Sequence, residues 1–228
     1  MTGPILALLR HADYQQPANV PSAWLPYALN EQGVEQAQQA AGYIRRFMDT
    51  HSLTLFPVID SSHMLRAWQT SSILGAALGL SDIEETERLA ERSVGAMANL
   101  TTMEIEKLLD DDPRYDSAPT GWKSSTDYRL PFQGAESLSE AGMRVADHIR
   151  LVEQQTPAGQ LRIIVGHGAS MRHAAMHLGL LSRDGVASVS MYHARPVFIR
   201  RTGDHWEHVD GEWKPRAKTE KSDEFSTA

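Results

Sequence analysis

Ile5-Leu6-Ala7-Leu8-Leu9-Arg10-His11 is an apolar run of five residues that ends in two polar ones. Such a run without polar alternation is typical of a strand buried on both faces of a parallel sheet. A second run, Leu161–Val165, has the same character and leads into Gly166-His167-Gly168. The sequence therefore predicts two buried strands, each with a histidine just past its end.

The segments around these runs alternate between helical and extended patterns. Asn30 is a favourable N-cap for a helix that continues to about residue 48. Leu55–Asp60 predicts another strand, and Ser61-Ser62 predicts a turn that starts the next helix, whose apolar positions are Leu65, Trp68, Ile73 and Ala77. Further helices are expected near 103–109, 138–152 and 170–180, with closing strands at 186–192 and 197–200. This alternation predicts an α/β fold of three layers, α/β/α, around a mainly parallel sheet.

Length and pattern indicate how the chain is divided. The 228 residues suit one α/β domain, which we place at 1–213. The periodic pattern loosens between 97 and 132, which predicts an insertion that roofs the site. Residues 214–228 are rich in charge and poor in apolar residues, so a disordered tail is expected.

Composition excludes several function classes. The chain has no cysteine, which excludes thiol catalysis and disulfides. Its formal net charge is −7 with no dense basic tract, so nucleic acid is not an expected partner. The apolar run at 4–9 is far shorter than a membrane span and no secretory leader precedes it, so no membrane partner and a cytoplasmic location are expected. A small phosphorylated substrate needs only a few converging arginines and stays compatible with this charge.

The two histidines indicate where the chemistry lies. Ligands of open parallel sheets bind outside the carboxyl ends of the strands, where His11 and His167 are both expected. Arg10 adjoins the first of them, and Arg66 falls in the first turn of the helix after the middle strand. A guanidinium group can donate two parallel hydrogen bonds to the oxygens of one phosphate, and helix N-termini favour anions. The sequence thus predicts a phosphate site at this edge.

Six segments, in order along residues 5 to about 180, make a family recognisable. Leu8-Leu9-Arg10-His11-Ala12 resembles the Arg-His-Gly signature of the histidine phosphatase superfamily, which has the phosphoglycerate mutase-like fold. The others that resemble its motifs are Asn30-Glu31-Gln32-Gly33, Ser61 to Thr70, Leu89 to Gly95, Glu136-Ser137-Leu138 and Val165-Gly166-His167-Gly168. Any one of these motifs is weak evidence, but the ordered set is specific.

The resemblance implies a role for each matching residue. His11 would attack phosphorus and form a phosphohistidine, while Arg10, Arg66 and His167, with Gly168 beside them, would bind the phosphate. Glu91 would act as the acid and base. The implied enzyme is a metal-independent phosphatase acting on a phosphomonoester, of the histidine acid type, with no metal or cofactor.

Departures from the family pattern bear on the substrate. Ala12 replaces a glycine, a mild change if its φ is negative, and Tyr14 and Pro17 replace residues common near the phosphate. Mutases of this family carry a longer insertion with added basic residues, whereas the 97–132 segment holds an acidic cluster at 110–112. A phosphatase is favoured over a cofactor-dependent mutase. A phosphoprotein substrate, and whether the chain forms a homodimer, are left open.

Other polar residues have competing interpretations. The segments that roof the site in this family contain candidate substrate contacts, namely Tyr14, Trp24, Tyr27, Tyr128 and Arg129. His173 and His177 have metal-site spacing without an obvious third ligand, so structural roles are expected. His205 and His208 are interpreted as part of a polar closing turn, and Arg172 and Arg195 as surface charges.

Overall fold

The computed structural model describes residues 3–21 and 24–216. In chain order its strands and helices are β1 Ile5–Arg10, α1 Glu31–His51, β2 Thr54–Ser62, α2 Leu65–Leu78, β3 Asp82–Thr86, α3 Thr102–Asp111, α4 Leu138–Gln155, β4 Gln160–Gly166, α5 Gly168–His177, β5 Val189–Met191, β6 Val197–Thr202, β7 His205–Asp210 and β8 Trp213–Pro215. Short 3₁₀ helices lie at Glu87–Leu89, Gly95–Met97, Trp122–Ser124 and Val186–Ser188.

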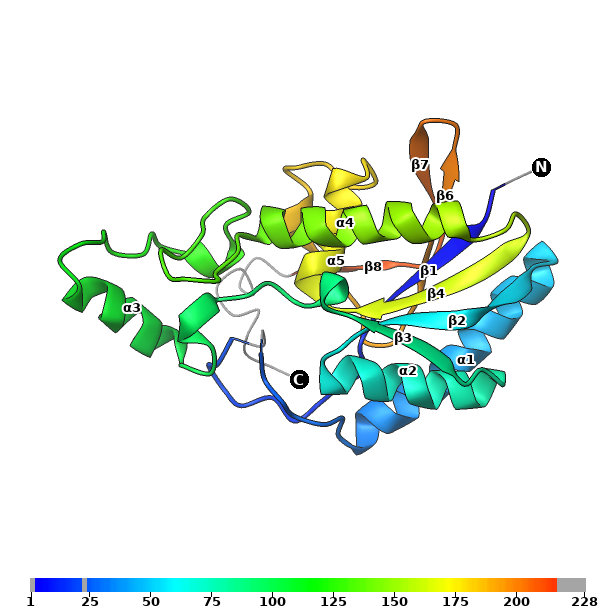
Figure 1. Cartoon of the computed structure of the whole chain (residues 1–228), viewed down its shortest axis with the longest axis horizontal. Coiled ribbons are helices and arrows are strands. Elements are labelled where there is room, and N and C mark those ends of the chain that lie inside the picture. The colour runs from blue at the N-terminus through cyan, green and yellow to red at the C-terminus, as the bar shows by residue number, and fades with distance from the viewer. Residues whose placement is uncertain (1–2, 22–23, 217–228) are drawn as a thin grey trace.

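A six-stranded sheet in the order β3-β2-β4-β1-β6-β7 forms the middle layer. The four strands from β3 to β1 are parallel. β6 pairs antiparallel with β1, and β7 pairs antiparallel with β6 at the edge of the sheet. Helices α4 and α5 lie above the sheet in Figure 1, and α1 and α2 lie below it. The predicted three-layer α/β/α fold is confirmed.

Strand β1 shows why its sequence has no polar alternation. Ile5, Ala7 and Leu9 belong to the core under α1 and α2, whereas Leu6 and Leu8 belong to the core under α4 and α5. Both faces of the strand are therefore covered by helices, and every residue from Ile5 to Leu9 is buried. This central position fixes the loop that follows β1, which carries His11.

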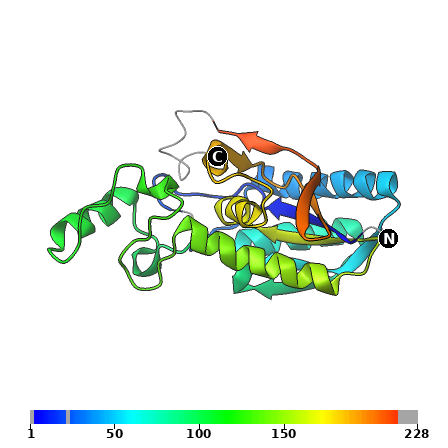
Figure 2. The ribbon, with the colours of Figure 1, turned by 90° about the horizontal axis from the view of Figure 1, so that it is seen from above.

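The 97–132 segment packs around a small core of its own. Trp122, Leu130 and Ile105 are buried there together with Val94 and Ala135. Figures 1 and 2 show α3 projecting to one side of the three layers, with the rest of this segment between α3 and the sheet. Helix α3 begins at a capping box formed by Thr101 and Glu104.

Several expectations for the sheet were wrong. Ser61-Ser62 does not form a turn but ends β2, and α2 begins at Leu65 after Met64. The strand expected at 186–192 is only β5, Val189–Met191, preceded by a 3₁₀ turn. Residues 205–210 form β7 instead of a polar turn. Sequence analysis did not predict β3.

The first residues of the tail expected from residue 214 belong to a strand. Trp213–Pro215 forms β8, which pairs antiparallel with β5. The remainder of that expected tail, from 217 onward, lies outside the described residues. The ordered chain therefore extends past 213, and β8 brings Lys214 back toward the end of β1.

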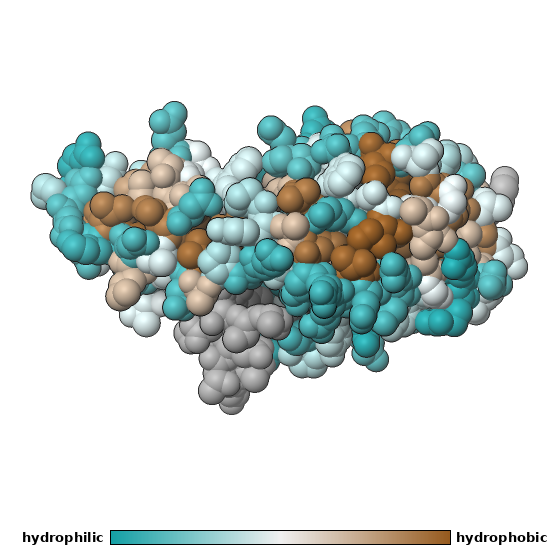
Figure 3. Space-filling view, turned by 90° about the horizontal axis from the view of Figure 1, so that it is seen from below, coloured by the Kyte–Doolittle hydropathy of each residue, from teal (hydrophilic) through white to brown (hydrophobic). Residues whose placement is uncertain are grey.

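Helix α2 buries a different face from the one that its apolar residues predicted. Leu65 and Trp68 are each 39% exposed, while Arg66, Thr70 and Ser71 are fully buried. The space-filling view from below, toward the layer of α1 and α2, shows apolar patches scattered among polar residues (Figure 3). No helix within residues 3–21 and 24–216 is both long and apolar enough to span a membrane.

Candidate active site

Neighbouring strands of the parallel part of the sheet deliver the predicted residues to one edge. His11 follows β1 and His167 follows β4, and these two strands pair in parallel. Arg66 lies in the first turn of α2 after β2, and Glu91 follows the 3₁₀ turn after β3. The His11 and His167 ring centroids are 5.1 Å apart. The predicted meeting of the two histidines is confirmed.

The His11 imidazole is held in one tautomer. Its Nδ1 lies 2.7 Å from the carbonyl oxygen of Ala12, and because a carbonyl only accepts, Nδ1 must carry the proton. Its Nε2 therefore holds a lone pair, which accepts a hydrogen bond from Arg66 Nε at 3.2 Å. Burial lowers the pKa of His11 well below its ordinary value, and the charge of Arg66 lowers it further. The side chain is a buried neutral imidazole whose Nε2 is available as a nucleophile.

The loop around His11 is held by the buried polar residues of α2, Arg66 and Thr70. The Ala12 amide donates to Thr70 Oγ1 at 3.0 Å, and that hydroxyl donates to the carbonyl of Arg66 at 2.7 Å. Ala12 is buried and is not among the residues with positive φ, so the replacement of a glycine there costs little.

His167 is held in the opposite tautomer. Arg66 Nη2 lies 3.1 Å from its Nδ1 and must donate, because a guanidinium only donates. Nε2 therefore carries the proton and donates to Ser62 Oγ at 2.9 Å. Burial, followed by the charges of Arg66 and Arg10, lowers the pKa of His167 well below its ordinary value. Ser62 thus sets which nitrogen of His167 can receive a proton.

Two guanidinium groups approach the histidines. Arg66 is fully buried, and besides both histidines it contacts the carbonyl oxygen of Leu25 at 3.1 Å. Arg10 Nη1 donates to the carbonyl of Met191 at 3.2 Å. A Cβ on Gly168 would lie 3.1 Å from Arg10 Cδ, so the absence of a side chain there leaves room for Arg10.

Glu91 is buried and faces the N-terminus of α5. Its Oε1 accepts hydrogen bonds from the amides of Arg92 at 2.9 Å and Ser170 at 2.8 Å, and its Oε2 accepts one from Ala169 at 3.1 Å. The Glu91 charge is close enough to Arg66 to raise the pKa of that guanidinium against the dominant lowering by burial. Oε2, with a single N–H partner, has the more available lone pair.

The segment that carries Glu91 is tied down by Arg144 of α4. Its Nη1 donates to the carbonyl oxygens of Glu87, Arg88 and Ala90 at 3.0–3.1 Å. Its Nε and Nη2 donate to the Glu136 carboxylate, which also accepts from the Ser93 amide at 3.1 Å. The Glu136-Ser137 motif therefore positions the predicted acid.

The candidate substrate contacts are divided between two places. Tyr14 is buried against the site, with its ring 5.2 Å from His11 and the Arg66 guanidinium 4.8 Å from its centroid. Trp24 and Tyr27 are about two-fifths exposed, and Trp24 Nε1 donates to Ser93 Oγ at 3.1 Å.

The other two candidates, Tyr128 and Arg129, contact residues away from the histidines. Tyr128 packs on Trp122, and Arg129 pairs with Glu140 at 3.2 Å. The structure brings Tyr14 to the histidines and places Tyr128 and Arg129 in contacts of the 97–132 segment.

His193 is a site residue that the sequence analysis missed. Its ring lies 5.5 Å from that of His11, and its Nδ1 is 3.8 Å from the Asp13 carboxylate. Burial, aided by Arg10, lowers the pKa of His193 to about 2. The available signal was its position just past the apolar segment 186–192, which repeats the pattern of a strand followed by a histidine.

Four other polar residues, two histidines and two arginines, were singled out in the sequence. His173 Nδ1 contacts the Ala169 carbonyl at 2.8 Å, and His177 Nε2 contacts the Ser139 carbonyl at 2.9 Å. Arg172 is fully buried, with its Nη1 donating to the Val189 carbonyl, so its interpretation as a surface charge was wrong. Arg195 is exposed.

Comparisons with known proteins show the family of the chain. The sequence profile of the histidine phosphatase superfamily (branch 1) matches residues 6–213. A 2,3-bisphosphoglycerate-dependent phosphoglycerate mutase of Parvibaculum lavamentivorans is 28% identical over 85% of this chain and 88% of its own, and one of Xanthobacter autotrophicus is 27% identical over 90% and 95%.

Solved structures show the same fold at lower identity. A mycobacterial glucosyl-3-phosphoglycerate phosphatase superposes with a TM-score of 0.67 at 23% identity, covering 93% of this chain and 99% of its own. The alpha-ribazole phosphatase of Shigella flexneri superposes with a TM-score of 0.68 at 20% identity, covering 90% and 94%.

Proposed function

Since the chain belongs to the histidine phosphatase superfamily (branch 1), we propose that it is a metal-independent phosphatase that hydrolyses a phosphomonoester through a phosphohistidine on His11. The observation that carries this proposal is the buried, neutral His11, whose Nε2 lone pair faces the Arg66 guanidinium with His167 alongside. A neutral imidazole is a competent nucleophile near pH 7 without a separate base.

The reaction proceeds in two displacements. His11 Nε2 attacks phosphorus, an N–P bond forms, and the bond to the ester oxygen breaks. Arg10 and Arg66 donate to the remaining oxygens, on which the charge of the transition state is spread. His167 joins them by taking up a proton on Nδ1, because its Nε2 proton is already donated to Ser62. Glu91, which enters this step as the protonated carboxylic acid, gives its proton to the departing oxygen and becomes a carboxylate. In the second displacement Glu91 takes a proton from water, the water oxygen bonds to phosphorus, and the N–P bond breaks to release inorganic phosphate.

The names of the sequence relatives make a phosphoglycerate mutase the second candidate. A mutase of this kind needs extra cations for a second phosphate, but the 97–132 segment has seven acidic and four basic residues. Three of those four cations are ion-paired, namely Lys107 with Asp111, Arg114 with Asp112 and Arg129 with Glu140. The charge of this segment favours the phosphatase.

A phosphoenzyme trap tests the proposal. The wild-type protein, mixed with a labelled alkyl phosphate and quenched without acid, is expected to carry an acid-labile, base-stable label on His11. His11→Ala should abolish both label and phosphate release, whereas His205→Ala, on the exposed edge strand β7, should change neither. Turnover above about one per cent of wild type in His11→Ala would refute the nucleophile, since loss of a nucleophile removes several powers of ten in rate.

A second assay separates the two reactions. Wild-type protein given monophosphoglycerate together with bisphosphoglycerate should release inorganic phosphate faster than it isomerises the monophosphate. Faster isomerisation would establish the mutase instead.

A further inference from the structure

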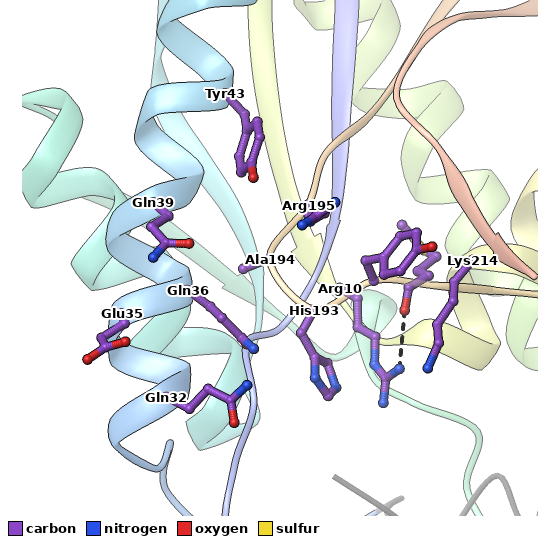
Figure 4. A pocket seen from close by; sticks show the side chains of 12 residues that line it. Arg10, Gln32, Glu35, Gln36, Gln39, Tyr43, His193, Ala194, Arg195 and Lys214 are labelled. Carbon is purple, nitrogen blue, oxygen red and sulfur yellow. Dashed lines mark hydrogen bonds between the residues drawn. The ribbon is translucent and has the colours of Figure 1, made fainter.

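A cavity of about 370 Å³ lies beside the reaction centre, between α1 and the segment 191–195. Figure 4 shows side chains from both sides converging on it. Its size falls in the range of small-molecule sites. None of the proposed chemical steps uses this cavity as a whole.

The cavity adjoins the proposed phosphate site, because two residues of that site also line the cavity. Arg10, a proposed phosphate ligand, lines it, and so does His193, whose ring is 5.5 Å from His11. Within the described part of the chain, the buried Nε2 of His193 has no hydrogen-bond partner. The wall formed by 191–195 is held against β1 because the Ala194 amide donates to the Arg10 carbonyl at 2.9 Å. Ala194 has a φ of 50°, a strained value for alanine that fixes the course of this wall.

Positive charge gathers on that wall of an otherwise acidic chain. Arg10, Arg195 and Lys214 line the cavity, against a single carboxylate, that of Glu35. Arg195 lies over the rings of Tyr192 and Tyr43, at 5.2 and 5.8 Å. Among residues 3–21 and 24–216, no carboxylate forms an ion pair with Arg195 or Lys214. Such a surplus of cations favours an anionic ligand.

The opposite wall is polar but uncharged along most of its length. Gln32, Gln36 and Gln39 lie on one face of α1, followed by Tyr43 (Figure 4). Gln36 Oε1 accepts from the Asp13 amide at 2.9 Å, which leaves its NH₂ group as a donor for a ligand. Amide and phenol groups both donate and accept, which suits the hydroxyl groups of a polyol or sugar.

We propose that this cavity is a subsite for a second, negatively charged end of a hydroxylated substrate, with Arg195 and Lys214 binding the anion and the α1 glutamines binding hydroxyls. This inference rests on the proposed phosphatase function. Because the ester oxygen must face Glu91 while the far end lies beside α1, the substrate requires a flexible chain between its two anionic groups.

Two esters of one length test the subsite. 6-Phosphogluconate and glucitol 6-phosphate are both open six-carbon chains, and they differ in a carboxylate or a hydroxymethyl group at the far end. The wild-type kcat/KM is expected to be higher for 6-phosphogluconate. Lys214→Met and Arg195→Met should each lower the ratio of the two kcat/KM values by roughly 10–150-fold, the worth of one hydrogen bond to a charged group. Lys107→Met, which removes an exposed cation of α3, should leave the ratio unchanged.

Binding to His11→Ala gives a readout that needs no turnover. Calorimetry on this variant should show tighter binding of 6-phosphogluconate than of glucitol 6-phosphate, and the added Lys214→Met should remove the difference. Equal binding of the two esters, or a preference that both cavity variants retain, would overturn the subsite even if p-nitrophenyl phosphate is hydrolysed. A binding preference without turnover of any ester would instead uphold the subsite and refute the phosphatase.

Discussion

Replacing Glu91 by glutamine separates its proposed chemical role from its structural one. In the folded protein the two carboxylate oxygens accept three backbone N–H groups, from Arg92, Ala169 and Ser170. A glutamine oxygen in the place of Oε1 keeps two of these hydrogen bonds. Its NH₂ group then faces the Ala169 N–H, and neither can accept.

The structural cost follows from that count. The partly buried N–H of Ala169 loses its acceptor, which costs at most about 1–3 kcal/mol. The loss of a carboxylate at the N-terminus of α5 adds about 0.3–1 kcal/mol. Each kcal/mol corresponds to a fall of roughly 2–4 °C in Tm for a chain of this size. Glu91→Gln should therefore remain folded at 25 °C, and thermal unfolding measures the loss.

The chemical cost depends on the leaving group. A positioned acid contributes roughly 10²–10⁴-fold, so hydrolysis of an alkyl phosphate should fall by that factor. An aryl phosphate leaves as a stable phenolate and should lose much less in the phosphorylation step. Dephosphorylation then limits turnover, so labelled phosphoenzyme should accumulate in a quenched-flow experiment with the aryl ester.

Glu136→Gln is the matched control, because Glu136 positions the Glu91 segment through Arg144 but carries no proton in the reaction. It should lower the rates for both esters by a similar, smaller factor. Equal losses for alkyl and aryl esters in Glu91→Gln would show that this variant acts through the position of α5 and that Glu91 is not the acid.

Two further predictions concern stability. The folded-state pKa of His11 and His193 lies below the unfolded value, so the unfolded chain binds more protons and stability should fall as pH drops below about 6.5. His193→Asn should lessen the loss between pH 7 and 5 by about 2 kcal/mol in urea unfolding, and an unchanged loss would contradict the burial argument. In α1, Gly33→Ala places a Cβ 1.9 Å from the Asp13 carbonyl oxygen and should lower the free energy of unfolding by roughly 1–3 kcal/mol. A Cβ at Gly42 meets only the end of the Arg46 side chain at 3.6 Å, so Gly42→Ala should raise that free energy by up to about 1 kcal/mol. Equal effects of the two would refute the close packing of α1 on the loop after His11.

The sequence predicted the central strands because their burial is complete. β1 and β4 are covered on both faces, and an unbroken apolar run as short as theirs favours a buried strand over a helix. Prediction failed at the two edges of the sheet. β3 reads Asp-Ile-Glu-Glu-Thr and β7 reads His-Trp-Glu-His-Val-Asp, each with exposed charged residues. Edge strands carry such charges to prevent pairing with other chains, and those charges also hide the strand pattern.

Predicting the site was most successful where motif and topology agree. Strand ends at one edge were enough to bring His11 and His167 together, and the resemblance added Glu91. His193 was missed because the short β5 ends before it and nothing in its neighbourhood carries a motif. Tyr128 and Arg129 lie in the segment expected to roof the site, but Tyr128 packs on Trp122 and Arg129 pairs with Glu140. These contacts join loop residues to a 3₁₀ turn and to α4, and periodicity does not encode them.

Helix α2 shows why a failed prediction can mark function. Apolar periodicity favoured burial of Leu65 and Trp68, yet both are partly exposed and Arg66 and Thr70 face inward. Burying a guanidinium is costly without partners, and Arg66 meets two histidines and the Leu25 carbonyl. The inward face of α2 is polar because Arg66 and Thr70 form hydrogen bonds with the loop that carries His11. The usual pattern of apolar burial is thus broken where α2 contributes to the proposed phosphate site.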